Sequence, residues 1–358
     1  MRRAAGRISG LIMATVMCGS VTAHAVAVAY AAEDFTFNVG LLLRAGHYYT
    51  FAEPYKQEVM DSSEFDVAEA ELATYGRVFD RVSYDVKVRS FSTVREAWVA
   101  ADLPAGFSAR IGRQFVPFGV EATTPEGSLT CSSRTASSSW IALGRSDGLR
   151  FDYVREGDDW PYEIGGAAGV YDHYYHRSGP LVDGAWRVYG TPAPGVRTLT
   201  AGCSFYYGKE PRGIEFEPYI EGYYYFSAPR LGFDVGYEAG PFGVSAEYMQ
   251  YLIRMVSSPV GSERPYEDKS HRGYFATLSY QRPLPYKHVD AVKPYVRYEH
   301  FQPAVLRKGY VASDLYTGGF STYFFDRILM FRADYTRIFE DDNRFTNDSI
   351  ASEFQLIF

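Results

Sequence analysis

Hydrophobic and polar residues alternate one by one over many short stretches of this chain. Between residues 35 and 43 every odd position is Phe, Val or Leu, whereas the even positions include Thr, Asn and Gly, and an Arg follows at position 44. The same alternation returns at 331–336, where Phe, Ala and Tyr oppose Arg, Asp and Thr. A period of two places successive side chains on opposite faces of a β-strand. The pattern therefore predicts an all-β protein whose sheet has one apolar and one polar face.

Along the whole chain this alternation predicts sixteen strands. We place them near residues 35–48, 65–76, 80–89, 94–103, 106–114, 146–155, 160–171, 185–193, 196–208, 230–239, 242–254, 271–282, 291–301, 312–324, 328–339 and 349–358. Short links such as Pro104–Gly106 and Phe325–Arg327 alternate with long links such as 172–184, 209–229, 255–270 and 340–348. The segment Glu215–Phe226 is also compatible with a strand. We place it in a long link, and a count of eighteen strands stays open as the alternative.

The longest link follows the fifth strand. Residues 115–145 carry no strand pattern before the alternation resumes. A loop of that length inside a compact fold is uncommon and usually functional. We therefore expect residues 115–145 to form an inserted loop with a role in function.

The first 31 residues have the pattern of a secretory signal peptide. Arg2, Arg3 and Arg7 precede an apolar stretch over 11–16, and Ala-Tyr-Ala at 29–31 offers a small-x-small cleavage site. We expect cleavage after residue 31, which leaves 32–358 as the mature chain. No later apolar run approaches the roughly 18 residues that a membrane-spanning helix requires. An exported chain without such helices is periplasmic, secreted or an outer-membrane barrel.

Composition favours the barrel among these classes. The chain has 31 Tyr, 25 Phe and 33 Gly, which is typical of transmembrane barrels with aromatic residues at both membrane interfaces. A last alternating strand that ends in Phe358 resembles the C-terminal signal of such barrels. We predict a transmembrane antiparallel β-barrel in the bacterial outer membrane, and sixteen strands leave room for an aqueous channel. We interpret Cys131 and Cys203 as two buried thiols, with a disulfide between them as the alternative.

Two motifs connect the chain to a known family. The sequence IGRQFVPFG at 111–119 resembles the GQF-x-x-PFG core of the phosphate-selective porin O/P family, and GPFGVSAEY at 240–248 is similar to a second hairpin of that family. The resemblance implies an outer-membrane porin, a homotrimer, and a long loop that folds into the lumen and sets the constriction. Phosphate-selective members are expected to carry several lysines on and near this loop. Residues 115–145 contain none.

The candidate pore-lining residues are the charged side chains on the polar face and in the long loop. Lumen-facing registers carry Arg44, Lys87, Arg89, Arg110, Arg150, Arg297 and Arg332, and the loop carries or adjoins Arg134, Arg145, Glu121 and Glu126. A guanidinium fork matches the oxygens of phosphate and carboxylate groups, so these arginines form a candidate anion ladder. Acidic residues lie on the same face. The alternative is therefore a set of paired charges that would line any water-filled pore.

The sequence predicts a porin that gives passive diffusion of small solutes with a preference for small anions such as phosphate. Two alternatives stay open: a weakly selective general porin, and a structural or adhesive barrel without an open channel. The expected partners are outer-membrane lipid, small solutes and two further copies of the chain. The net charge changes from −7 to about −10 once residues 1–31 and their three Arg are removed, which gives no support to nucleic-acid binding. No histidine has a motif partner for catalysis or metal binding, so we expect no enzyme and no cofactor.

Overall fold

The computed structural model describes residues 7–18, 21–32, 35–50, 62–79, 81–90, 92–155, 164–172, 182–191, 198–213, 223–227, 229–255, 269–303, 312–340 and 348–357. Most of the predicted long links 172–184, 255–270 and 340–348 lie outside these ranges, as does the terminal Phe358.

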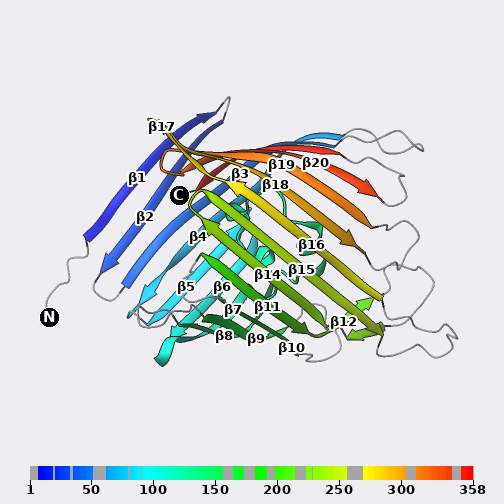
Figure 1. Cartoon of the computed structure of the whole chain (residues 1–358). Helices are drawn as coiled ribbons and strands as arrows, with labels where there is room; N and C mark the ends of the chain where they lie inside the picture. The colour runs from blue at the N-terminus through cyan, green and yellow to red at the C-terminus, as the bar shows by residue number, and fades with distance from the viewer. Residues whose placement is uncertain are drawn as a thin grey trace, which may run out of the picture.

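Within the described residues, sixteen antiparallel strands pair in chain order and close a ring (Figure 1). They are β3 (Phe35–Thr50), β4 (Ser62–Val78), β5 (Val82–Arg89), β6 (Thr93–Asp102), β7 (Phe107–Phe115), β8 (Arg145–Arg155), β9 (Ile164–Asp172), β10 (Val182–Gly190), β11 (Leu199–Tyr207), β14 (Arg230–Ala239), β15 (Phe242–Met255), β16 (Lys269–Tyr280), β18 (Val289–Gln302), β19 (Ser313–Phe324), β20 (Leu329–Glu340) and β21 (Ser349–Ile357). The last strand pairs with the first, from Ile357 opposite Leu42 to Ser349 opposite Thr50. The predicted sixteen-strand antiparallel barrel is confirmed.

Five further strands lie outside this ring. A hairpin of β1 (Arg7–Cys18) and β2 (Val21–Ala32) pairs with the first residues of β3. A second hairpin, β12 (Lys209–Gly213) with β13 (Tyr223–Ser227), lies between β11 and β14 in the chain, and β17 (Arg282–Tyr286) pairs with the start of β18. Because β11 pairs directly with β14, the β12–β13 hairpin adds nothing to the ring. The ring therefore has sixteen strands and not eighteen.

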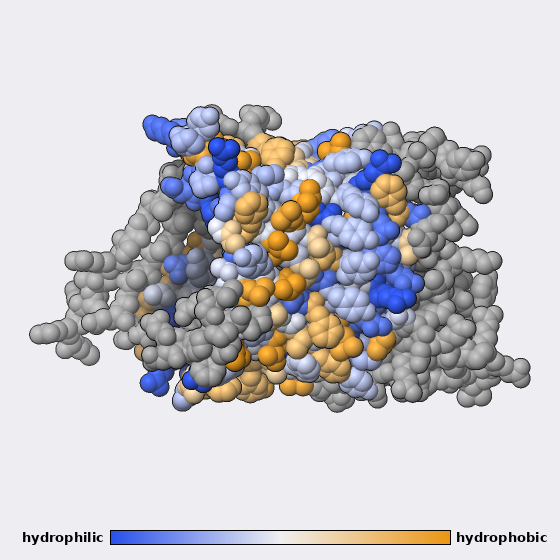
Figure 2. Space-filling view, viewed as in Figure 1, coloured by the Kyte–Doolittle hydropathy of each residue, from blue (hydrophilic) through white to orange (hydrophobic). Residues whose placement is uncertain are grey.

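The outer face of the ring is apolar. Ile111, Val296 and Phe233 are 63%, 57% and 54% exposed in the middle of their strands. Figure 2 shows apolar side chains gathered across the outside of the strands. On the inner face the strands of the ring carry buried charged residues, among them Arg297 of β18, Arg332 of β20 and Glu353 of β21. This arrangement is the reverse of a soluble barrel, in which the apolar side chains point inward. No helix in the described part of the chain is long and apolar enough to cross a membrane.

Residues 116–144, which we call the inner segment, connect β7 to β8 and fold as three short helices: α1 (Val120–Thr123), η2 (Glu126–Ser128) and α2 (Ala136–Ile141). The side chain of Thr135 caps α2 by accepting from the Ser138 backbone N–H at 3.1 Å. Before α1 the chain turns at Gly119, whose φ of 75° is a conformation that favours glycine. A Cβ at this position would also lie 2.8 Å from Glu247 Oε1.

The largest buried apolar cluster lies between the inner segment and the barrel wall. Val116, Phe118 and Ile141 of the inner segment pack against side chains from β9, β10, β11, β15 and β18. The wall residues of this cluster are Tyr171, Ala185, Tyr206, Met249, Tyr251 and Phe301. The hydrophobic core of the protein therefore lies inside the barrel, on one side of its lumen. Both Cys131, which is buried in the inner segment, and Cys203 on β11 are free thiols.

Candidate functional site

Buried arginines of the wall hold the inner segment by its main chain. Arg332 donates to two carbonyl oxygens of the segment at 2.5 and 3.0 Å, and Arg44 donates to a third at 3.0 Å. Both guanidinium groups also pair with Glu353, at 2.8 and 2.7 Å. Arg297 donates to a fourth carbonyl at 2.9 Å, and Arg230 to the carbonyl of Ile141. Three of these carbonyls belong to residues 131–133, between η2 and α2, and that of Ile141 ends α2. The four arginines therefore satisfy backbone carbonyls that have no partner within a helix.

Buried carboxylates of the wall accept hydrogen bonds from backbone N–H groups of the same inner segment. Glu247 accepts from two backbone N–H groups at the start of α1, at 2.8 and 3.1 Å. Glu299 accepts from Ser137 N at 3.0 Å, and Asp334 accepts from Ser132 N at 2.6 Å. A buried carboxylate that lacks such donors is costly, so each contact stabilises both the wall and the segment.

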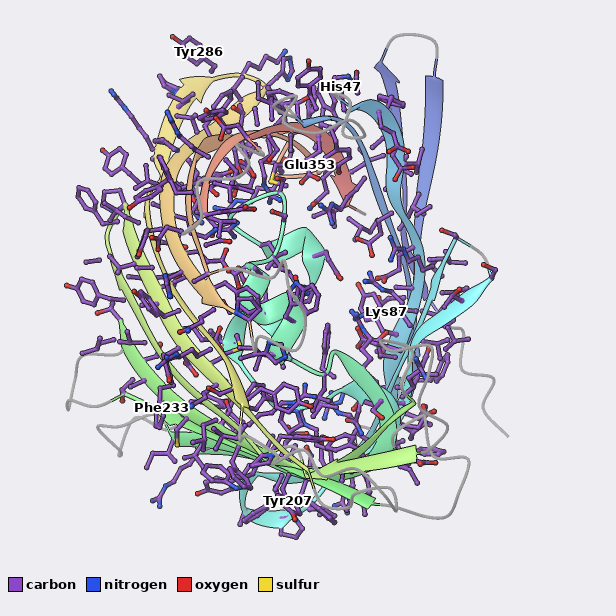
Figure 3. The ribbon with its side chains drawn as sticks, turned by 90° about the vertical axis from the view of Figure 1, so that its right-hand side faces the viewer. His47, Lys87, Tyr207, Phe233, Tyr286 and Glu353 are labelled. Carbon is purple, nitrogen blue, oxygen red and sulfur yellow. The ribbon has the colours of Figure 1, made fainter. Side chains whose placement is uncertain are left out.

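Strands β4–β8 form the part of the interior that faces the inner segment across the lumen. Figure 3, which looks along the barrel, shows the inner segment on one side of the interior and Lys87 on the other. Lys87 lies 3.2 Å from Asp85 and 3.3 Å from Glu96. Close by, Arg150 lies 2.5 Å from Asp152 and Arg110 lies 3.8 Å from the same carboxylate.

Three cations on this wall, which we call the open wall, are more exposed than the acids of the same wall that pair with them. The side chains of Lys87, Arg110 and Arg150 are 18–25% exposed. Their partners Asp85, Asp152 and Glu96 are 6–16% exposed. The Arg110 guanidinium also lies 4.0 Å above the Trp98 ring, which holds it in place. In each of these pairs, the cationic side chain is therefore the more exposed partner.

A cluster of charges joins the inner segment to the wall at Glu126. Its carboxylate lies 2.5 Å from Arg95, 3.7 Å from Arg134 and 3.9 Å from Arg145. Burial opposes ionisation of Glu126, but these three guanidinium groups outweigh it and lower the pKa of the carboxyl below its ordinary value of 4.5. Arg145 also pairs with Glu96 at 3.0 Å. The cluster therefore ties η2 to β6 and β8.

Ten of the eleven predicted site residues fall into three groups, and Glu121 is apart from them. Arg44, Arg297 and Arg332 lie behind the inner segment and are only 1–6% exposed, so they hold the segment and do not face the open lumen. Lys87, Arg110 and Arg150 lie on the open wall, and Arg89 lies opposite Glu71 in the β4–β5 pairing. Arg134, Arg145 and Glu126 meet at the charge cluster. Glu121 accepts from the backbone N–H of Thr135 at 2.9 Å and lies 3.5 Å from Arg297, so it braces the inner segment from within.

Sequence reasoning missed Arg95 and Arg230. Lys87 pairs with Glu96 and the neighbouring Val88 pairs with Val94, so Arg95 is the extra residue of a β-bulge. A bulge re-aims one side chain and interrupts the period of two. Strict alternation places Arg95 on the face opposite Glu96, on the outside of the barrel. For Arg95, the only signal in the sequence was a charged residue at a position where alternation predicts an apolar one.

No protein-family model matches the sequence, and no characterised protein shows significant sequence similarity to it. Solved structures do resemble the chain. The anion-selective porin from Comamonas acidovorans has a TM-score of 0.61 at 10% identity, over 91% of this chain and 100% of that chain. OmpF of Salmonella typhi in complex with daunomycin has a TM-score of 0.61 at 12% identity, over 90% and 98%. The trimer form of OmpT, an outer membrane protein of Vibrio cholerae, has a TM-score of 0.58 at 11% identity, over 91% and 100%. At these identities the likeness shows a common fold.

Proposed function

We propose that this chain is an outer-membrane porin that lets small solutes diffuse through its lumen. The observation that carries the proposal is the reversed polarity of a closed sixteen-strand ring, with exposed apolar side chains outside and charged side chains inside. Closure leaves no unpaired strand edge in lipid. A ring of sixteen strands is wide enough to hold water as well as an inserted segment.

The inner segment sets the constriction in this proposal. Its apolar side packs against strands between β9 and β18, so the path for solutes runs along the wall of β4–β8, past the place where the Glu126 cluster joins the segment to β6 and β8. The signal peptide over 1–31 directs export, and residues 32–358 form the mature barrel. Mass spectrometry of the protein from isolated outer membranes is expected to find Ala32 as the first residue, and an intact residue 1 would contradict export by cleavage.

The channel prefers small anions weakly. Support comes from the greater exposure of Lys87, Arg110 and Arg150 relative to their acidic partners. One protein of similar fold is itself an anion-selective porin. Strict phosphate selectivity has less support, because the inner segment has no Lys and the resemblance to the phosphate-selective porin O/P family rests on its motifs alone. A weakly selective general porin is the alternative.

Current through a planar bilayer tests the proposal. The purified mature protein is expected to give stepwise conductance, and the reversal potential in a KCl gradient is expected to have the sign of a chloride-preferring channel. A cation-preferring reversal potential would remove the anion preference and leave the porin. If the protein inserts into the bilayer but passes no current, the porin proposal is wrong and the structural or adhesive barrel is favoured instead.

Three copies assemble into a homotrimer in this proposal. One of the proteins of similar fold is described in a trimer form. Light scattering of the protein in detergent, corrected for bound detergent, is expected to give three times the mass of the mature chain. A monomer mass at all protein concentrations would contradict assembly without affecting conduction.

A further inference from the structure

The charge cluster at Glu126 is built around the carboxylate of that residue. Three guanidinium groups from three parts of the fold, Arg95 on β6, Arg134 in the inner segment and Arg145 on β8, converge on one carboxylate. That carboxylate belongs to the inner segment and is 20% exposed, whereas the three arginines are 12–16% exposed. The place that Glu126 fills therefore opens toward the lumen more than its surroundings do.

Each of the three guanidinium groups has a second support. Arg95 pairs with Glu69 and lies 3.6 Å from Glu71. Arg134 donates to two backbone carbonyls of the inner segment, at Glu121 and Thr124. Since these contacts do not involve Glu126, they keep both groups in place when its carboxylate leaves.

Arg145 is supported in the same way. It donates to Glu96 at 3.1 and 3.0 Å and lies 3.8 Å from the centre of the Phe115 ring. The convergent arrangement is therefore built into the wall and the segment and does not depend on the carboxylate it surrounds.

We propose that Arg95, Arg134 and Arg145 form a binding site for small organic carboxylates, which the side chain of Glu126 fills as a tethered occupant. A solute carboxylate reaching the site through the lumen competes with Glu126 for the guanidinium forks, whose geometry suits a planar carboxylate. The proposal rests on the proposed porin function only for this route of access. Because a tethered group acts at a high effective concentration, of the order of mM for a short flexible link, free carboxylates bind the native site weakly.

Chemical complementation tests this site directly. Glu126→Ala removes the occupant and its ion pair with Arg134. Propionate has the carbon skeleton of the whole Glu side chain, one carbon more than the part that Ala lacks. In detergent micelles, calorimetry is expected to show propionate binding to Glu126→Ala at least about tenfold more tightly than to the native protein, because the tethered competitor is gone. The double variant Glu126→Ala with Arg134→Gln is expected to lose this gain.

Asp102→Ala provides the matched control. It removes one carboxylate from an exposed pair with Arg77 at the other end of β6, and is expected to bind propionate like the native protein. Equal propionate binding by Glu126→Ala and the native protein would overturn the proposal. So would a gain for inorganic phosphate without a gain for propionate. If Glu126→Ala does not fold, the same comparison with Glu126→Ser decides, because its short side chain also leaves the place of the carboxylate open.

Calorimetry does not require current to flow, so the two proposals fail separately. A barrel that binds propionate as expected but does not conduct would contradict the porin and keep the carboxylate site. A conducting barrel without the gain would contradict the carboxylate site alone.

Discussion

At the residue scale, the buried arginines of the wall act on the main chain of the inner segment and not on solutes. Arg332 shows this most clearly, because it is 1% exposed and its nitrogen atoms reach Glu353 and two backbone carbonyls. Removing one member of a buried ion pair leaves the other charge without compensation, which is costly. We therefore expect substitutions here to change stability and loop position before they change selectivity.

The first prediction concerns Arg332→Met. The variant leaves Glu353 with Arg44 as its remaining arginine and frees two carbonyl groups of the inner segment, so we expect a loss of about 3–5 kcal/mol in the free energy of unfolding. Limited proteolysis of the folded barrel is expected to cut within 116–144. Arg77→Met, which breaks an exposed pair with Asp102, is the control and is expected to change stability by less than about 1 kcal/mol. Equal protease resistance of native and Arg332→Met protein would contradict the anchoring role.

The second prediction concerns the thiol of Cys131, which is 3% exposed in the inner segment. Burial raises the pKa of this thiol from 9.0 to about 12. Since the thiolate is the reactive form and a raised pKa lowers its fraction at every pH below 12, a water-soluble maleimide is expected to label Cys131 very slowly at pH 7–8. Labelling is expected to speed up in Arg332→Met, where the segment is released. Rapid labelling of the native protein would show that the segment opens without any substitution.

At the element scale, the strands were predictable because each one must bury one face and hydrate the other. A period of two records that requirement directly, and the predicted ranges 242–254 and 328–339 differ from β15 and β20 by one residue at each end or less. The pattern also placed Arg44 and Arg332 on the inner face. It could not place the inner segment over them, because alternation reports which face of the wall a side chain occupies and not what covers that face.

The charge cluster was only partly predictable for a related reason. Arg134, Arg145 and Glu126 stood out as charged residues in or beside a long link, but their meeting depends on contacts between residues that are not neighbours in the chain. Arg95 reaches the cluster through a bulge in β6. A bulge inserts one residue without a clear sequence signature. Alternation therefore placed Arg95 on the wrong face of β6, although it placed the later residues of this strand correctly.

The third prediction is also at the element scale and concerns the open wall of β4–β8. Lys87→Glu replaces a partly exposed cation with an acid beside Asp85 and Glu96, so the reversal potential in a salt gradient is expected to shift toward cation preference. Lys287→Glu makes the same change of charge in the exposed turn before β18 and is expected to leave the reversal potential within experimental error. Equal shifts for both variants would mean that selectivity follows the total charge and not the wall.

At the scale of the whole molecule, the fold separates two environments with one layer of sheet. Apolar side chains such as Ile111 and Val296 lie on the outside, and charged side chains occupy the inside of the same strands. Because every strand of the ring has two neighbours, closure leaves no unpaired backbone edge in the described part of the ring. The outer face should therefore respond to charge as a lipid-facing surface does.

The fourth prediction tests that response. Ile111→Arg places a charge in the middle of β7 on the outer face and is expected to lower the free energy of unfolding in lipid vesicles by about 2–4 kcal/mol. Tyr286→Arg, at an exposed position in β17 at one end of the barrel (Figure 1), is expected to change it by less than about 1 kcal/mol. Denaturant titration of the folded protein measures both. A stable Ile111→Arg barrel would contradict contact between this face and hydrocarbon.

The off-centre position of the apolar cluster between the inner segment and β9–β18 divides the cylinder into two halves under different constraints. In the half that contains the cluster, side chains are closely packed, so most substitutions there are expected to destabilise the fold. The other half, apart from the Glu126 cluster, carries more exposed charges, and substitutions there are expected to disturb the fold less. In the proposed porin, natural variation that changes permeation should therefore accumulate on β4–β8 outside that cluster.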